Sequence, residues 1–513
     1  MCMPGLFFPA VLFSKGSGAK RACTFLRKIA LHMKHEQQSR QKGWTQQWQY
    51  RALLCVSVGL LSLLFAVRLL PALGASTGAS WHGDWSTYLY FNGRSGFNGY
   101  ETMLNPKTIG SMKVHWMAHA GGAISVQPVE ANGMIYWGSW DGYEHAMDVH
   151  GRQVWTRYLG RTSTCGSGAG VASTATIATV PMHGKMTAVL IVGGGDASLY
   201  TLDASTGTVI WKTPLGSSPS HFLWSSPALY KGNVYIGIAS FGDCPSVQGK
   251  LVQLSLATGT IEHTFNVVPQ GCTGGGLWSA PTIDPGTEKV YLATGSPDAC
   301  WTSETYVNAM VELRASDLGL VDSWQVPRAE WVFDSDFGAT PTLFTANRGG
   351  SVRPMVGAVN KNGIYYALEQ GALSKGPVWR ATIARGGTDP DLGDGSISSS
   401  AWDGSRLYVA GGNTIINGKN CSGSVRALNV VTGSFLWQQC LTSGEVLGAV
   451  TVVPGVVVVG AGTLLMAFDA PSGKPLFVYK DSHRGSSFEG ACSISRGVLY
   501  VGNFDGMLYA FGL

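Results

Sequence analysis

One pattern of apolar and polar positions recurs along residues 112–513. Small residues and a proline lead into an apolar stretch that ends in glycine. A second apolar stretch ends in a hydrophobic-Asp or similar pair, a Thr-Gly turn follows, and a third stretch ends in an aromatic residue. The clearest copy is LYTLDASTGTVIW at residues 199–211. Such runs predict β-strands joined by tight turns, and a repeat of roughly 40–60 residues is typical of a four-stranded propeller blade.

The two ends of the repeat region predict how a ring of blades closes. Seven copies of the pattern are complete, but the last copy, residues 488–513, contains only three strands. A Trp-ending strand at residues 113–118 has no partners of its own. Because an open ring would leave unpaired strand edges, we expect this N-terminal strand to complete the last blade. The predicted fold is therefore all-β, an eight-bladed β-propeller, in which the aromatic ends of the outer strands pack between blades, as expected for Trp155, Trp211, Trp379 and Trp437.

The segment before the propeller predicts a route to the membrane. Residues 1–51 contain nine Lys and Arg against one acidic residue, which predicts a basic cytoplasmic tail without stable structure. Residues 52–73 form an apolar run, either a transmembrane anchor helix or a cleaved secretory signal. Residues 74–111 would link this segment to the propeller. Under both alternatives the positive-inside rule places the propeller outside the cytoplasm, either membrane-anchored or secreted.

Composition changes this picture in one respect. Only 13% of the residues are charged, and outside the basic tail 27 Lys and Arg stand against 30 Asp and Glu. The propeller is therefore slightly acidic, and we expect no nucleic-acid partner.

Four phrases in the chain resemble one known family. With GGLWSAPTID at 275–284, DSDFGATPTLF at 334–344, NKNGIYYAL at 360–368 and NGRSGFN at 92–98, residues 81–513 resemble the PQQ-repeat family. Its best-known members are the quinoprotein alcohol dehydrogenases, and the chain is most similar to the polyvinyl-alcohol-dehydrogenase-like proteins. The resemblance implies oxidation of an alcohol, small or polymeric, with pyrroloquinoline quinone (PQQ) and Ca²⁺. The same repeat builds a scaffold lipoprotein of the outer-membrane assembly machinery, so a non-catalytic binding or assembly scaffold is the alternative.

The resemblance also implies which side chains hold the cofactor. In the family's dehydrogenases the quinone lies over the central channel on an aromatic floor, Ca²⁺ polarises its reactive carbonyl, and an Asp takes the alcohol proton. Trp278 falls at the floor, Lys361 at the cation that faces the quinone oxygens, and Asp334 at the catalytic base. Each has a structural alternative, because Trp224 shows that such a Trp can belong to the repeat, Asp334 or Asp336 can cap a turn, and Lys361 can be solvated.

The metal site that the resemblance implies is altered in this chain. Ser296 replaces the family's metal-binding Asn, and its hydroxyl is a weaker Ca²⁺ ligand than a carboxylate or carbonyl oxygen. Asp298 follows two residues later, and Asp243 takes the place of the family's Glu in the third blade. With Asp334, these residues form the expected metal-ligand set.

The cysteines predict one stapled face. Six of the seven cysteines of the propeller fall in loops and Cys492 lies near the start of a strand, so we expect all seven on the face that binds the cofactor in the family. An oxidising compartment favours disulfides there. The preferred pairs are Cys272–Cys300 and Cys421–Cys440, with one cysteine left over. The family's adjacent cysteine pair is absent, which leaves Cys165 alone. No Cys-x-x-Cys-His occurs, so we expect no covalent haem and a separate electron acceptor.

Overall fold

The computed structural model describes residues 83–182, 184–300, 304–483 and 485–513. The predicted basic tail and the hydrophobic segment 52–73 lie outside the described residues. Within the part of the chain that is described, no helix has the length and apolar character needed to cross a membrane. The helical elements there are four short 3₁₀ turns, η1 (Ile109–Ser111), η2 (Arg328–Glu330), η3 (Leu373–Lys375) and η4 (Pro390–Leu392).

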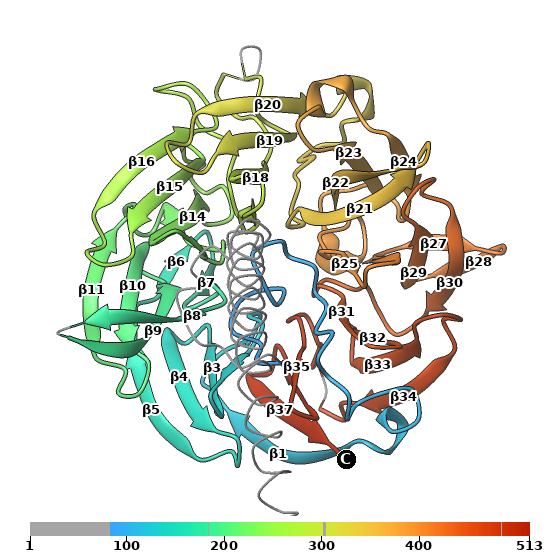
Figure 1. Cartoon of the computed structure of the whole chain (residues 1–513), viewed down its shortest axis with the longest axis horizontal. Helices are drawn as coiled ribbons and strands as arrows, with labels where there is room; N and C mark the ends of the chain where they lie inside the picture. The colour runs from blue at the N-terminus through green and yellow to red at the C-terminus, as the bar shows by residue number, and fades with distance from the viewer. Residues whose placement is uncertain (1–82, 183, 301–303, 484) are drawn as a thin grey trace, which may run out of the picture. The chain divides into compact units, whose positions relative to one another are not determined.

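Eight antiparallel sheets follow one another around a central axis, which confirms the predicted eight-bladed all-β propeller (Figure 1). The first strand of each blade is innermost and the last lies at the rim. Blade 1 contains β2 (Val129–Ala131), β3 (Met134–Gly138), β4 (Tyr143–Asp148) and β5 (Gln153–Tyr158), and blade 2 contains β8 (Thr176–Met182), β9 (Lys185–Gly193), β10 (Ser198–Asp203) and β11 (Val209–Pro214). Blade 3 contains β13 (Ala228–Tyr230), β14 (Asn233–Ser240), β15 (Lys250–Ser255) and β16 (Ile261–Asn266), and β12 (His221–Phe222) also pairs with β14. Blade 4 contains β17 (Thr282–Asp284), β18 (Lys289–Ala293), β19 (Ala309–Arg314) and β20 (Leu320–Gln325).

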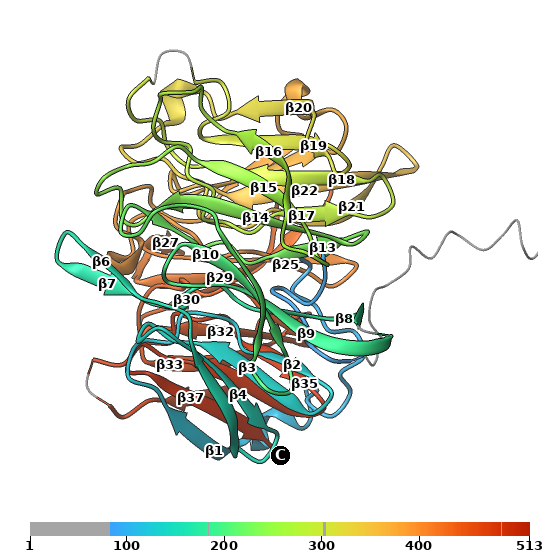
Figure 2. The ribbon, with the colours of Figure 1, turned by 90° about the vertical axis from the view of Figure 1, so that its left-hand side faces the viewer.

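The second half of the ring repeats this arrangement. Two small ribbons project from loops of the propeller; they are β6 (Thr162–Thr164) with β7 (Ser167–Ala169), seen in Figure 2, and β27 (Thr414–Ile416) with β28 (Lys419–Cys421). Blade 5 contains β21 (Thr342–Arg348), β22 (Ser351–Val359), β23 (Ile364–Glu369) and β24 (Trp379–Thr382), and blade 6 contains β25 (Ala401–Trp402), β26 (Arg406–Gly411), β29 (Gly423–Asn429) and β30 (Phe435–Leu441). Blade 7 contains β31 (Thr451–Val453), β32 (Val456–Ala461), β33 (Leu464–Asp469) and β34 (Pro475–Lys480). Blade 8 contains β35 (Ser493–Ser495), β36 (Val498–Gly502) and β37 (Met507–Gly512), with β1 (Lys113–His119) at the rim.

Blade 8 closes with the N-terminal strand, as the sequence predicts. β1 runs antiparallel to β37, from Lys113 opposite Gly512 to His119 opposite Met507. The two ends of the repeat region therefore meet in one sheet, and the ring is continuous.

An aromatic residue at the end of an outer strand locks its blade to the next one, as predicted. Trp155 of blade 1 donates a hydrogen bond from Nε1 to the carbonyl of Ala204 in blade 2, at 2.9 Å. Its ring covers Gly207, whose φ is +67° and where a Cβ atom would lie 2.7 Å from the ring. Both the left-handed backbone and the close ring require glycine at this turn. The same arrangement recurs for Trp116 on Gly151, Trp211 on Gly259, Trp379 on Gly433 and Trp437 on Gly473.

Residues 85–98, which we call the channel segment, run inside the ring (Figure 1, blue). This segment forms hydrogen bonds with the innermost strand of every blade, from Glu130 of blade 1 to Ile494 of blade 8. The residues that make these bonds are Trp85, Ser86, Asn92, Gly93, Ser95, Gly96 and Asn98.

Arg94 is the one charged residue of the channel segment, and 0% of its surface is exposed. Its guanidinium donates to the carbonyls of Pro227 at 3.2 Å, Pro281 at 3.1 Å and Tyr88 at 2.5 Å. Burial lowers its pKa to about 10. Because these two prolines lead into the first strands of blades 3 and 4, Arg94 joins both blades to the channel.

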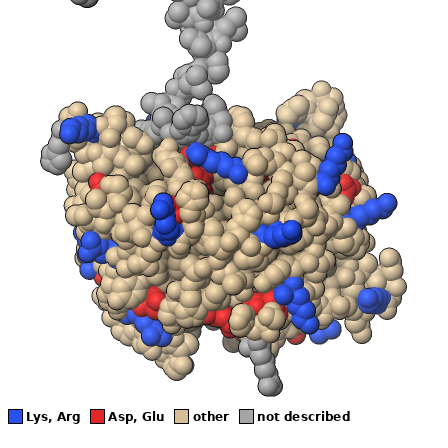
Figure 3. Space-filling model, turned by 90° about the horizontal axis from the view of Figure 1, so that it is seen from below, with Lys and Arg blue, Asp and Glu red and all other residues tan. Residues whose placement is uncertain are grey.

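Surface charge contributes little to this architecture. On the side shown in Figure 3, Lys and Arg stand singly on a largely uncharged surface. Exposed ion pairs such as Lys231–Glu288, at 2.5 Å, contribute at most about 1 kcal/mol each. Strand pairing and burial between blades therefore hold the ring together.

We expect Arg94→Met to lower the free energy of unfolding by about 2–5 kcal/mol, because buried carbonyls lose their donor. Urea unfolding followed by circular dichroism measures this loss. The control is Arg314→Met, which removes a half-exposed ion pair with Asp317 and should change stability by less than about 1 kcal/mol. Equal losses in the two variants would contradict the role given to Arg94.

Candidate functional site

A cavity of about 970 Å³ opens among loops of blades 3, 4 and 5. These loops either lead into a first strand or join the second strand of a blade to the third, so they share one face of the propeller. All six site residues named from the sequence line this site cavity: Asp243, Trp278, Ser296, Asp298, Asp334 and Lys361.

The ring of Trp278 is fixed from two sides. Its Nε1 donates to Oδ2 of Asp336 at 3.0 Å. Gly338 lies against the ring, and a Cβ atom there would come within 2.2 Å of it. Nζ of Lys361 lies 5.3 Å from the ring centroid. Trp278 therefore offers a rigid aromatic wall with a cation beside it.

Lys361 and two aspartates form a charged group next to Trp278. Nζ of Lys361 lies 2.7 Å from Oδ2 of Asp334 and 3.8 Å from Oδ2 of Asp336. The side chain of Lys361 is 8% exposed, that of Asp336 12% and that of Asp334 29%. Of the two aspartates beside Lys361, Asp334 is therefore the more accessible.

Burial sets the protonation of this group. It raises the pKa of Asp336 to about 7, because the charge of Lys361 offsets only part of the desolvation and the charges of Asp334 and Asp243 add to it. Burial alone would lower the pKa of Lys361, but the charges of Asp336 and Asp334 outweigh it and raise that pKa. Lys361 is therefore a fixed cation, and Asp336 is the group that titrates.

Hydrogen bonds join the turn at residues 334–336 to the turn at residues 360–361, which brings these side chains together. Nδ2 of Asn360 donates to the carbonyl of Ser335 at 2.5 Å, and Oγ of Ser335 donates to Oδ1 of Asn360 at 3.1 Å. The backbone N–H of Lys361 donates to the carbonyl of Asp336 at 2.9 Å. Asp334 itself has a left-handed φ of +56°, a conformation that a non-glycine residue keeps only when its surroundings hold it.

The predicted metal ligands are placed unevenly. The backbone N–H of Ser296 donates to Oδ1 of Asp336, and Oγ of Ser296 donates to Oδ1 of Asn308 at 3.3 Å. Asp243 and Asp298 line the same cavity, but their carboxylates accept hydrogen bonds from Ser240 and from Thr273, the latter at 2.6 Å. The structure thus brings Trp278, Ser296, Asp334 and Lys361 together around Asp336, with Asp243 and Asp298 farther along the wall.

The residues present fit a hard cation and a planar ring. Five aspartates line the cavity against one lysine, counting the described residues. Carboxylate oxygens are the ligands that Ca²⁺ and similar ions prefer. A cation would stabilise the ionised form of Asp336, whose pKa is raised first by burial and then by the charges of Asp334 and Asp243. The flat wall of Trp278 suits an aromatic cofactor.

Disulfides flank the cavity. Cys272–Cys300 and Cys421–Cys440 are confirmed, and among the cysteines that the structure describes Cys492 is unpaired and buried. Cys165, which has no adjacent cysteine, forms a third disulfide with Cys244, beside Asp243; the sequence did not predict this pair. The separation of 79 residues hid this pair from sequence reasoning. Cys440 lies inside β30 and not in a loop.

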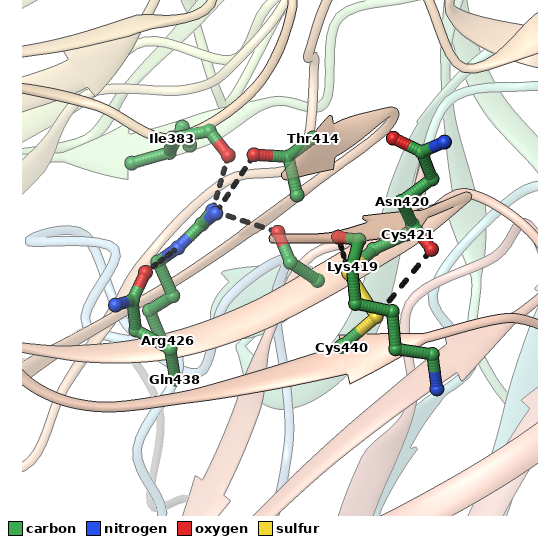
Figure 4. Close-up of a disulfide and its surroundings, with 9 residues drawn as sticks. Ile383, Thr414, Lys419, Asn420, Cys421, Arg426, Gln438 and Cys440 are labelled. Carbon is green, nitrogen blue, oxygen red and sulfur yellow. Dashed lines mark hydrogen bonds between the residues drawn. A yellow bond between two sulfur atoms is a disulfide. The ribbon is translucent and has the colours of Figure 1, made fainter. Parts of the chain in front are cut away.

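The third disulfide holds the β27–β28 ribbon. Figure 4 shows Cys421–Cys440 close to Arg426, which donates to Thr414 at 3.0 Å and to Gln438 at 2.9 Å. Burial lowers the pKa of Arg426 to about 10. The ribbon is therefore tied to blade 6 at both of its strands.

Several residues of the cavity wall received no role from the sequence. They include Asn308, Trp331 and Asp389, while Trp224 was assigned only to the repeat. Asp336 was noted only as a neighbour of Asp334, although it contacts three of the predicted residues. A signal existed for Trp224, because its Trp-Ser-Ser-Pro phrase parallels Trp-Ser-Ala-Pro at Trp278. Asn308 and Asp389 carried no such signal.

Comparison with known proteins gives consistent matches. A family model of PQQ repeats, described as outer membrane protein assembly factor BamB, matches residues 109–221, 145–303 and 362–512. A polyvinylalcohol dehydrogenase of Pseudomonas sp. is 23% identical over 467 residues, which is 80% of this chain and 69% of that protein. One of Sphingopyxis sp. (strain 113P3) is 25% identical over 78% of this chain and 67% of its own length. The crystal structure of quinohemoprotein alcohol dehydrogenase from Comamonas testosteroni superimposes with a TM-score of 0.67 at 16% identity, covering 86% of this chain and 81% of that one, and shows the fold.

Stability should depend on pH through Asp336. Without bound cations the pKa of Asp336 is about 7 in the folded protein, against an ordinary value of 3.8. The folded state therefore keeps a proton that the unfolded chain releases, and stability falls as pH rises from about 4 to about 7. Asp336→Asn should remove this part of the slope, up to about 1.4 kcal/mol per pH unit. Urea unfolding at several pH values in chelator measures it.

Asp317→Asn is the control, because Asp317 lies half-exposed in a turn beside Arg314, away from the cavity, and this variant should keep the wild-type slope. If Asp336→Asn and the wild type show the same slope, the raised pKa is wrong.

Proposed function

The chain belongs to the PQQ-repeat family of β-propellers, and from this we propose that it is an alcohol dehydrogenase that uses PQQ and a hard cation in the site cavity. One observation carries the proposal. The six residues that the family resemblance implies, drawn from three blades, line a single cavity. Two relatives are polyvinylalcohol dehydrogenases, which supports a small or polymeric alcohol as the substrate.

Each residue then has a task. When bound, the quinone would accept the hydride of the alcohol while the cation polarises its carbonyl. Trp278 would bind the flat face of the ring, and Lys361 would direct its positive charge at the quinone oxygens. Lys361 stays charged because Asp334 and Asp336 surround it.

The two neighbouring aspartates would divide two roles. Asp334 is the more exposed and would accept the proton of the alcohol hydroxyl as general base. Both oxygens of Asp336 already accept hydrogen bonds, from Trp278 and Ser296, so Asp336 is fixed in the way a cation ligand needs to be. Asp243, Ser296 and Asp298 would complete the ligand set, with Asp334 at its edge.

We also propose that the propeller works outside the cytoplasm and passes electrons to a separate acceptor. Three disulfides on one molecule fit an oxidising compartment. The segment 52–73 would either anchor the protein or be cleaved, and the N-terminal sequence of the mature protein distinguishes the two.

Reconstitution of the protein with PQQ and a cation tests the proposed dehydrogenase activity. The purified full chain is stripped with chelator, loaded with PQQ and either Ca²⁺ or La³⁺, and assayed by dye reduction with primary, secondary and polymeric alcohols. Asp334→Asn should lower turnover by about 10²–10⁴-fold while PQQ binding stays near that of the wild type, because only the proton acceptor is lost. Asp336→Asn should instead weaken cation binding.

Asp317→Asn, far from the cavity, should leave turnover unchanged. A wild-type chain that binds no PQQ at micromolar concentration with either cation would contradict the proposal and favour the non-catalytic scaffold. An active Asp334→Asn variant would show that the base is misassigned.

A further inference from the structure

Asn308 carries a hydrogen-bond donor that no described residue satisfies. Its side chain is 0% exposed and lies in the wall of the site cavity. Oδ1 accepts a hydrogen bond from Oγ of Ser296, whereas Nδ2 is buried without a partner. A buried donor left unpaired costs about 1–3 kcal/mol, so its retention calls for a reason.

The backbone holds Asn308 in this position. Its N–H donates to the carbonyl of Gly295 at 2.9 Å, and its own carbonyl accepts from the N–H of Val326 at 2.9 Å. Its φ of +48° is left-handed, which Asn and Asp tolerate better than other residues with side chains. These contacts hold the backbone of Asn308 in place, and the bond from Ser296 holds its Oδ1.

The cavity has many acceptors and few free donors. Among the described side chains that line it, Asn308 alone has a fully buried polar atom without a partner. The ammonium of Lys361 already contacts Asp334 and Asp336. An oxygen-rich ligand held here beside Lys361 and a cation can accept a further hydrogen bond, and Nδ2 of Asn308 is a donor without a partner.

We infer that Nδ2 of Asn308 donates a hydrogen bond to a carbonyl or carboxylate oxygen of the ligand in the site cavity. The inference rests on the proposed function, in which that ligand is PQQ. The hydroxyl of Ser296, which donates to Oδ1 of the same amide, keeps its lone pairs for the cation. One asparagine would thus serve both halves of the site.

Two variants test this role. Asn308→Asp keeps the shape and tolerates the left-handed φ but loses the N–H donor; Asn308→Gly removes the amide without adding charge. The apoprotein, as the full chain with Ca²⁺, is titrated with PQQ, and quenching of Trp fluorescence gives the Kd. We expect the Kd to rise about 10- to 100-fold in both variants, with unchanged circular dichroism.

Asn429→Asp is the matched control. Asn429 ends the third strand of blade 6, and its Oδ1 accepts a hydrogen bond from the backbone N–H of Val431. Asp148, Asp203 and Asp469 occupy the same position in other blades, so an aspartate is tolerated there. The Asn429→Asp variant should therefore bind PQQ with the Kd of the wild type.

The outcomes separate the two proposals. If the wild type binds no PQQ, the proposed function and this inference both fail. If the wild type binds PQQ and both Asn308 variants bind within about twofold of it, only the inference fails. A loss in Asn308→Asp alone would reflect added negative charge and would also overturn it.

Discussion

The pairing of β1 with β37 is the constraint on which the rest of the molecule depends. It joins the first strand of the propeller to the last, so every blade has a neighbour on both sides. Without it, blade 8 would expose the edge of β37, and the tryptophan contact from Trp116 to Gly151 of blade 1 would be lost. The site cavity needs this closure because its residues come from three successive blades, and only a closed ring fixes their separation.

The site cavity, by contrast, contains several features that destabilise the folded protein. Carboxylates crowd around one lysine, Asp334 keeps a left-handed backbone, and Asn308 leaves a donor unpaired. The surrounding structure holds these groups in place. Hydrogen bonds between Ser335 and Asn360 join the two turns that carry the site, and two disulfides lie beside the cavity. Such a division between a strained site and a rigid support is expected where binding of a ligand relieves the strain.

The fold was predictable because its signals are local and repeated. Strand, turn and aromatic positions recur in each blade, and the missing strand of the last blade implied closure. The six candidate site residues line one cavity, and their roles remain predictions from the family resemblance. The orientation of the two aspartates could not be predicted, because nothing in Asp-Ser-Asp indicates that Asp336 is buried against Trp278 while Asp334 is partly exposed. The Cys165–Cys244 pair and the place of Asn308 depend on contacts between loops, which no local pattern encodes.

The channel segment bears on the order in which the protein is made. It precedes all eight blades in the chain, yet it contacts the innermost strand of each one. During synthesis this stretch therefore emerges before any blade, and blades 1 to 7 can dock against it one after another. The rim strand β1 also emerges early but must wait for β37, residues 507–512, before it can pair. Ring closure therefore depends on synthesis of β37, and a product truncated before this strand would remain an open ring.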